Sequence, residues 1–294
     1  MEHGLFYQTH GKQSDNEPAL VLIHGLFGNS DNLSVIRRHF EDSHFVVSID
    51  LPDHGKSVRS QSFSFEDYTK RVCLLISELK IKHCVLIGHS LGGKVAMLVA
   101  KSLSNSQVSA GATQNGDREN KNAQSKGIQP KETKHSSASA IVDKLIVLDI
   151  APVPYPARHH KVFKGLKAID LQAISSRSDA SNILANELED KGTQAFLLKS
   201  LYQDDNGDWQ WRFNLELIMR DYAQLSDWNE SGLVYDGPTL FMVGGESNYV
   251  MPEHQSTILA QFPQATAKVV PAGHWLHAQK PQIVNALITK FLRG

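Results

Sequence analysis

The sequence predicts an α/β fold, in which helices cover both faces of a mostly parallel central sheet. Short apolar runs rich in β-branched residues alternate along the chain with longer amphipathic stretches. The 294 residues are 41% hydrophobic and 21% charged, which is enough apolar material for a sizeable core and too much for a disordered chain. Alternating strands and helices are typical of parallel sheets, whose functional sites lie at the carboxyl ends of the strands.

Six apolar runs predict the strands of this sheet, and five amphipathic stretches predict its helices. We expect strands at residues 20–24, 45–49, 85–88, 145–149, 240–244 and 267–270. We expect helices at residues 33–40, 65–79, 93–103, 252–262 and 281–292. A chain of this length is within the range of a single catalytic domain that carries an insertion.

Two segments interrupt the alternation, so the predicted core comprises residues 1–150 and 238–294. Residues from about 104 to 140 are rich in Ser, Asn, Gln, Lys and Gly, which favours a flexible insertion over a binding arm. Residues 151–237 carry helical patterns instead, at 163–169, 180–188, 193–201 and 215–225. Because this ordered insertion begins at a strand end, we expect it to form a helical cap over the carboxyl edge of the sheet.

Charge and cysteine content narrow the classes of partner and compartment. Lys plus Arg number 30 and Asp plus Glu number 31, so the net charge of −1 gives no reason to expect nucleic acid or an anionic membrane as partner. Cys73 and Cys84 stand among apolar residues, which favours buried reduced thiols and a cytoplasmic location. We expect neither secretion nor a membrane span, because no stretch approaches about 18 apolar residues.

The motif Gly88-His89-Ser90-Leu91-Gly92 is the most informative feature of the chain. It lies between the predicted strand at 85–88 and the predicted helix at 93–103. A strand that reverses into a helix within a few residues forces the middle residue into a strained conformation, and flanking glycines remove side chains that would clash. We therefore predict Ser90 to be an exposed nucleophile rather than part of an ordinary glycine turn.

A serine nucleophile needs a base, and fourteen histidines compete for this role. His274 is the predicted base, because it lies in the loop after the last strand, at the edge of the sheet where Ser90 is expected. His277 lies in the same loop and is the rival candidate. His24 ends the first strand and is expected to brace a loop by hydrogen bonding.

The negative charge that develops on the carbonyl oxygen needs two fixed N–H donors, which backbone amides can supply. One donor is expected from the residue after the nucleophile, which is Leu91. The other is expected from Leu26, in the glycine-containing loop 24–28 that follows the first strand.

Taken together, these motifs resemble the α/β-hydrolase superfamily, and the match covers nearly the whole chain. Within it, five segments look like the bacterial YbfF-type esterases: residues 22–28, 88–94, 149–153, 211–214 and 273–275. The resemblance implies an α/β-hydrolase fold and a carboxylesterase or thioesterase. The implied substrates are small acyl esters and acyl-CoA thioesters, cleaved through an acyl-enzyme without cofactor or metal.

The acid that orients the base is the least regular part of the pattern. Most of the superfamily carries an aspartate after the seventh strand, where this chain has Ser247. Asp149 is the predicted acid, because a charged residue that ends an apolar strand is costly to bury unpaired. The resemblance to the YbfF-type esterases implies the same position for the acid. Glu246 is the alternative acid, and Ser247 is expected to hydrogen-bond His274 or Asp149.

Other functions would use the same fold, since a fold does not fix a function. A carbon–carbon bond hydrolase or lyase and a cofactor-free haloperoxidase-like enzyme would keep a similar triad. A noncatalytic ligand-binding module is the alternative from a different class. Labelling by a fluorophosphonate separates this last alternative from the enzymes.

Overall fold

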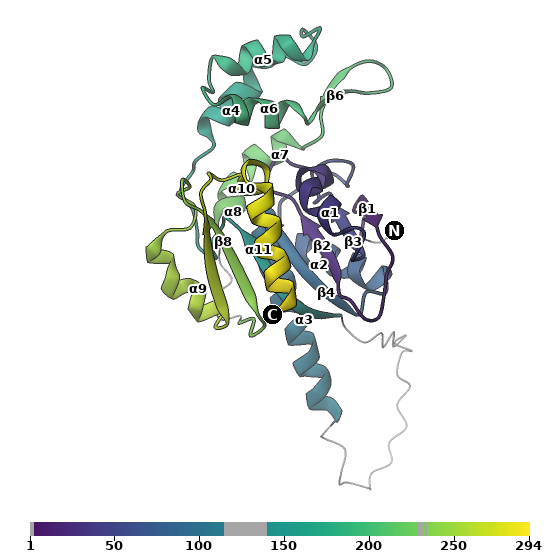
Figure 1. The fold of residues 1–294 in the computed structure, drawn as a ribbon. Coiled ribbons are helices and arrows are strands. Elements are labelled where there is room, and N and C mark those ends of the chain that lie inside the picture. Colours follow the sequence, from purple (N-terminus) through teal and green to yellow (C-terminus); the bar gives the residue numbers. More distant parts are fainter. Residues whose placement is uncertain (1–2, 115–139, 229–231, 233) are drawn as a thin grey trace, which may run out of the picture.

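The computed structural model describes residues 3–114, 140–228, 232 and 234–294 (Figure 1). Its main sheet has seven strands in the order β1-β3-β2-β4-β5-β8-β9, and every neighbouring pair is parallel except β1 with β3. The strands are β1 (Tyr7–His10), β2 (Ala19–Ile23), β3 (Val46–Ile49), β4 (His83–His89), β5 (Ile141–Leu148), β8 (Thr239–Gly244) and β9 (Ala265–Val270). The predicted α/β fold with a mostly parallel sheet is confirmed.

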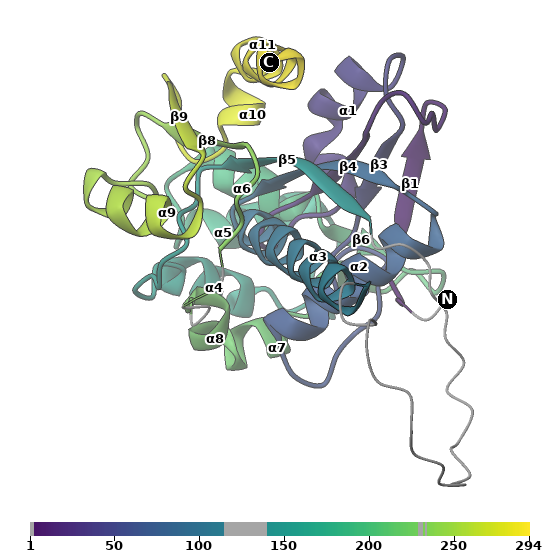
Figure 2. The same ribbon diagram turned by 90° about the horizontal axis from the view of Figure 1, so that it is seen from below.

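Helices cover both faces of this sheet (Figure 2). One face carries α1 (Ser34–Phe40), α10 (Leu276–Gln279) and α11 (Pro281–Arg293), and the other carries α2 (Phe65–Glu78), α3 (Leu91–Gln114) and α9 (Gln255–Gln261). Successive side chains of a strand point to opposite faces, so each central strand supplies two cores. In β2, Val21 packs into the core with α2 and α3, whereas Leu22 packs into the core with α1 and α11.

The six predicted strands and five predicted helices are all present, and the largest difference in their bounds is the extension of the helix predicted at 93–103 to Gln114. The helix predicted at 33–40 begins after a 3₁₀ turn, η1 (Ser30–Leu33), and the helix predicted at 252–262 divides into η2 (Pro252–His254) and α9.

The predicted insertion is wrong at its beginning. Residues 104–114, expected to be loop, continue α3 to Gln114. Once the apolar stretch 93–103 has nucleated the helix, adding residues costs little, and no proline interrupts the chain before Gln114. The rest of the predicted flexible insertion, residues 115–139, lies outside the described residues.

Sequence patterns missed three strands. The polar segment Tyr7–His10 forms the edge strand β1, which pairs only with β3. Within residues 151–237, β6 (Leu201–Gln203) and β7 (Trp209–Trp211) form an antiparallel hairpin. Asn206-Gly207 between them is a hairpin turn signal that could have located this hairpin in the sequence.

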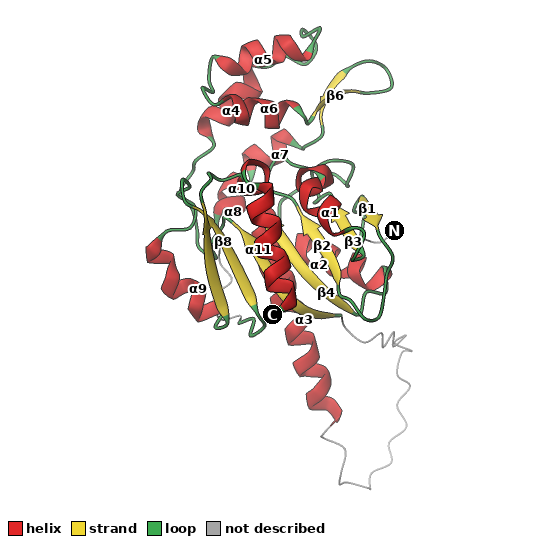
Figure 3. Cartoon of the chain, in the orientation of Figure 1, coloured by secondary structure: helices red, strands yellow, loops and turns green. Residues whose placement is uncertain are grey.

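The remaining elements of residues 151–237 are helices, which lie beyond the carboxyl ends of the sheet strands (Figures 1 and 3). They are α4 (His160–Ala168), α5 (Arg177–Ala185), α6 (Lys191–Leu198), α7 (Leu215–Arg220) and α8 (Tyr222–Ser226). Side chains of Ser176 and Asp190 accept hydrogen bonds from the first turns of α5 and α6, which fixes where these helices begin. None of the helices in the described ranges is long and apolar enough to cross a membrane.

Replacing Gly88 by Ala is expected to lower the free energy of unfolding by about 1–3 kcal/mol through overpacking. A Cβ atom at Gly88 would lie 2.2 Å from the carbonyl oxygen of Gly92. Gly273→Ala is the matched control, because its Cβ would meet nothing closer than 3.5 Å. Urea denaturation measures both variants, and equal stability of the two would contradict the prediction.

Candidate active site

Ser90 lies in the turn between β4 and α3, as the motif predicts. Its φ of +53° is in the left-handed region that non-glycine residues rarely adopt. The neighbouring glycines are needed there, because a Cβ on Gly92 would lie 2.3 Å from the carbonyl oxygens of Ile23 and His24. Only 9% of Ser90 is exposed, which is less than the sequence predicts, since residues of the 151–237 segment line the cavity around it.

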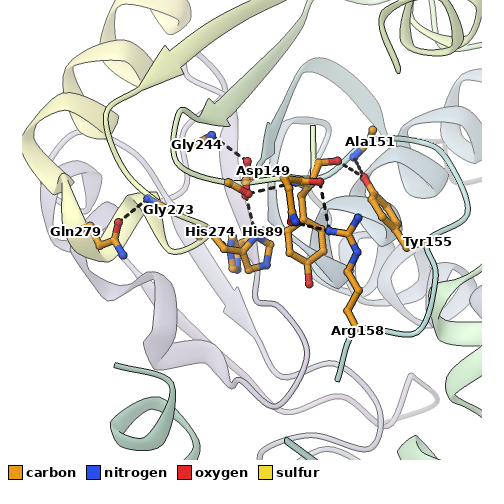
Figure 4. Close-up of polar contacts among 12 residues, drawn as sticks. His89, Asp149, Ala151, Tyr155, Arg158, Gly244, Gly273, His274 and Gln279 are labelled. Carbon is orange, nitrogen blue, oxygen red and sulfur yellow. Dashed lines mark hydrogen bonds and ion pairs between the residues drawn. The ribbon is translucent and has the colours of Figure 1, made fainter. Parts of the chain in front are cut away.

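Asp149 begins the connection after β5 and is completely buried. One carboxylate oxygen, Oδ1, accepts the Gly244 amide at 2.8 Å. The other, Oδ2, lies 2.8 Å from Nδ1 of His274 and accepts the Ser247 hydroxyl at 2.5 Å (Figure 4). The structure therefore brings the predicted acid and base into direct contact and places Ser247 against the acid.

The sheet explains why residues so distant in sequence meet. Ser90 follows β4, Asp149 follows β5, and His274 lies in the loop after β9, so all three stand at the carboxyl edge. The Ser90 amide donates to the Leu148 carbonyl at 3.1 Å, next to Asp149. The hydroxyl of Ser90 makes no hydrogen bond to His274 within the described ranges, and such contacts commonly tighten only when substrate binds.

The rival residues occupy different environments. Glu246 is exposed, and its carboxylate forms no ion pair with His274 in the part of the chain that the structure describes. His277 is buried against the ring of His89, with centroids 4.5 Å apart, and burial lowers its pKa to about 3. A histidine in that environment is neutral near pH 7, and no ion pair joins His277 to Asp149 among the described residues.

The two predicted oxyanion donors flank Ser90. Leu26 and Leu91 both line a narrow cavity of about 50 Å³ together with Ser90. Leu91 is the first residue of α3, where a backbone N–H has no partner within the helix. Phe27 has a φ of +63°, and its carbonyl accepts the Ser200 hydroxyl at 2.9 Å, which fixes the loop that carries Leu26.

His24 braces the same loop, as the sequence predicts. Its Nε2 accepts the Leu51 amide at 3.0 Å, so its Nδ1 carries the proton and donates to the Gly25 carbonyl at 2.8 Å. Burial lowers the pKa of His24 to about 4, which keeps this ring neutral near pH 7.

The cavity wall includes residues that sequence reasoning did not single out. Lys94, Tyr155 and Tyr249 line it, together with Arg158 and His159 of the 151–237 segment. Lys94 lies one helical turn after Ser90 and donates to the carbonyls of Ser226 and Asp227 at 2.9 Å each. Burial lowers the pKa of Lys94 to about 7. The presence of a lysine in the otherwise apolar stretch 93–103 is the sequence signal that could have identified Lys94 as a residue of the site.

The described residues also contain a larger apolar groove, of about 590 Å³, between α9 and strands β8 and β9. Ser247 borders it, but Ser90 and His274 are not among its lining residues. Within the described ranges, no group of three or more His, Cys, Asp or Glu side chains is arranged to hold a metal ion.

The fold and site define an α/β protein whose polar residues gather at the carboxyl edge of a parallel sheet. Comparisons with known proteins agree with this class. A model of the alpha/beta hydrolase family matches residues 20–287. Esterase YbfF of Escherichia coli is 33% identical over 97% of this chain and 96% of its own length. The sn-1-specific diacylglycerol lipase ABHD11 of Mus musculus is 32% identical over 94% of this chain and 81% of its own length.

Solved structures show the same likeness. A marine microorganism esterase superposes with a TM-score of 0.81 at 26% identity, over 98% of both chains. This chain therefore belongs to the α/β hydrolase family, and the resemblance inferred from its motifs is confirmed.

Buried histidines predict how stability depends on pH. Burial lowers the pKa of His54 and His277 to about 3 and that of His24 and His159 to about 4. In the unfolded chain each ring has a pKa near 6.5, so below that pH the unfolded state binds protons that the folded state does not. The contribution of each buried ring to the free energy of unfolding is therefore complete above pH 6.5 and is lost as the pH falls. We expect the free energy of unfolding to fall by about 1.4 kcal/mol per pH unit for each such histidine below pH 6.5.

Urea denaturation at several pH values between about 7 and 5 measures this slope. His54→Gln removes one of the groups and should reduce the slope, whereas His160→Gln, at an exposed position, should leave it unchanged. An unchanged slope in His54→Gln would show that this ring does not contribute.

Proposed function

We propose that this protein is a serine hydrolase that cleaves carboxylic esters through an acyl-enzyme intermediate. The observation that supports it most directly is the contact of the buried Asp149 carboxylate with Nδ1 of His274, at the same sheet edge as Ser90. The names of the relatives, an esterase and a lipase, agree with ester cleavage.

In the proposed reaction, the Ser90 oxygen attacks the ester carbonyl while its proton passes to Nε2 of His274. Nδ1 of His274 keeps its own proton and donates a hydrogen bond to the Asp149 carboxylate, whose negative charge balances the positive charge of the imidazolium. The amides of Leu26 and Leu91 hold the oxyanion of the tetrahedral intermediate. Asp149 is thus the orienting acid in this proposal, with Ser247 as the donor that holds it.

Collapse of the intermediate breaks the bond to the alcohol, which leaves with the proton from His274. Water then attacks the acyl-enzyme and gives its proton to the same imidazole. The carboxylic acid departs as Ser90 recovers its proton. This cycle uses side chains and backbone amides alone, so the proposal includes no cofactor and no metal.

The substrate is proposed to be a small acyl ester. The cavity beside Ser90 measures only about 50 Å³, which favours short acyl groups. Residues 151–237 act as a cap in this proposal, because Tyr155, His159 and Tyr222 line the cavity from that segment. Acyl-CoA thioesters are the second proposed substrate class, because a thioester carbonyl undergoes the same attack.

We also propose a cytoplasmic location. Cys73 and Cys84 are both free, and burial raises the pKa of Cys73 to about 11, so neither residue is poised to form a disulfide.

Ser90→Ala is expected to abolish hydrolysis of p-nitrophenyl butyrate and labelling by a fluorophosphonate, because both reactions use the serine oxygen. Circular dichroism should show an unchanged fold. The matched control is Ser104→Ala, a serine within α3 about four helical turns beyond Ser90. Retained turnover in Ser90→Ala would overturn the assignment, and the same assay with butyryl-CoA tests the thioester.

Asp149→Asn is expected to lower kcat by about 10²–10⁴-fold, because an amide cannot balance the imidazolium charge. Glu246→Gln should change kcat by less than about twofold, since surface changes away from the reacting groups have small effects. Steady-state kinetics with p-nitrophenyl butyrate compare the two variants. The reverse order of effects would move the acid to Glu246.

A further inference from the structure

The imidazole of His274 is enclosed by more than its contact with Asp149. The ring of Tyr249 lies parallel to it, with centroids 3.9 Å apart and an interplanar angle of 19°. His89 approaches with its centroid 4.7 Å away, and Nε2 of His89 lies 2.9 Å from the His274 carbonyl. One ring edge is thus held by a carboxylate, and one face is covered by an aromatic ring.

Tyr249 is itself held from several directions. Its amide donates to the Ser247 hydroxyl at 3.2 Å, and its carbonyl accepts the Tyr155 hydroxyl at 2.6 Å. The guanidinium of Arg158 lies 4.8 Å from the centre of the Tyr249 ring. Arg158 is fixed in turn by a 2.7 Å hydrogen bond to the Asn248 side chain.

The Tyr249 ring thus has two partners, the imidazole of His274 at 3.9 Å and the guanidinium of Arg158 at 4.8 Å, both measured to the centre of the phenol ring. Arg158 comes from the segment after β5 and His274 from the loop after β9 (Figure 4). The phenol ring is therefore held through contacts from two different segments of the chain while it stacks on the imidazole.

We propose that Tyr249 is a positioning residue for the base, an inference that rests on the function proposed above for His274. A hydrogen bond at Nδ1 fixes one edge of the ring but leaves its plane able to tilt about that bond. The parallel phenol removes this freedom, so that Nε2 keeps its aim at the Ser90 oxygen. The π face also attracts the imidazolium that forms when His274 takes the proton.

The surrounding groups are consistent with this role. Burial lowers the pKa of His89, His159 and His277, so these neighbouring rings are neutral near pH 7. Burial also raises the pKa of Tyr249 to about 12, so the stacked ring is an uncharged phenol. Asp149 carries the balancing negative charge at Nδ1 of His274, and the guanidinium of Arg158 contacts the Tyr249 ring 4.8 Å from its centre.

The test compares Tyr249→Leu, which removes the aromatic face, with Tyr249→Phe, which keeps it and removes only the hydroxyl. We expect Tyr249→Leu to lower kcat for p-nitrophenyl butyrate by about 10- to 100-fold, as small misplacements of reacting groups do. KM should change by less than about threefold, because the loss falls on the chemical step. Tyr249→Phe should retain kcat within about twofold.

A second readout follows the base directly. The proton shared by Nδ1 of His274 and Asp149 is expected to give a strongly downfield proton resonance in the parent and in Tyr249→Phe. Loss or broadening of this resonance is expected in Tyr249→Leu. If Tyr249→Leu does not fold, Tyr249→Met, with an unbranched side chain that adapts to gaps, takes its place.

Two controls separate the possible outcomes. Tyr202→Leu removes a tyrosine that stacks under Arg212, with 4.2 Å from guanidinium to ring centre, and should leave kcat unchanged. Ser90→Ala must be inactive, since activity there would overturn the proposed function itself. With Ser90→Ala inactive, full kcat in Tyr249→Leu, or equal losses in the Leu and Phe variants, would overturn the inference alone.

Discussion

The buried carboxylate of Asp149 is the constraint on which the rest of the site depends. A charged group with no exposure to solvent must have each oxygen satisfied, or its burial costs several kcal/mol. Three donors meet this demand, from Gly244, Ser247 and His274. Because these donors come from the end of β8 and from the loops after β8 and β9, satisfying one carboxylate also fixes both loops against the end of β5.

Backbone strain accompanies this arrangement. Phe27, Ser90 and Asp149 have φ values of +63°, +53° and +51°, and they stand at the ends of three neighbouring strands. Such conformations cost about 1–3 kcal/mol each and persist only where the surroundings hold them. Here the parallel strands and the glycines of the turn hold these three residues in place. The stability of the core therefore maintains the strained backbone at the carboxyl edge of the sheet.

The sequence was sufficient for the fold, and it singled out Ser90, Asp149 and His274 as candidates that the structure places at one sheet edge, because strand periodicity and the motif around Ser90 are local signals. The sequence was insufficient for residues whose structure depends on contacts with distant parts of the chain. The edge strand Tyr7–His10 has a polar sequence and forms only because β3 offers a partner. Tyr249 carries no local signal, since its significance arises from an imidazole 25 residues further along the chain. Lys94 likewise gains its partners only when α8 ends beside it.

The pairing of adjacent strands explains why a carboxylate that follows β5 reaches the imidazole of His274. Leu148 of β5 is in register with Met242 of β8, so the loops that follow the two strands reach the same imidazole. A carboxylate at position 247 would stand where the Ser247 hydroxyl now lies, 2.5 Å from Asp149. Two carboxylates at that distance cannot both remain ionised. An ionised carboxylate at position 149 is therefore compatible with a neutral donor at position 247, and in the proposed triad the Ser247 hydroxyl is the complement of Asp149.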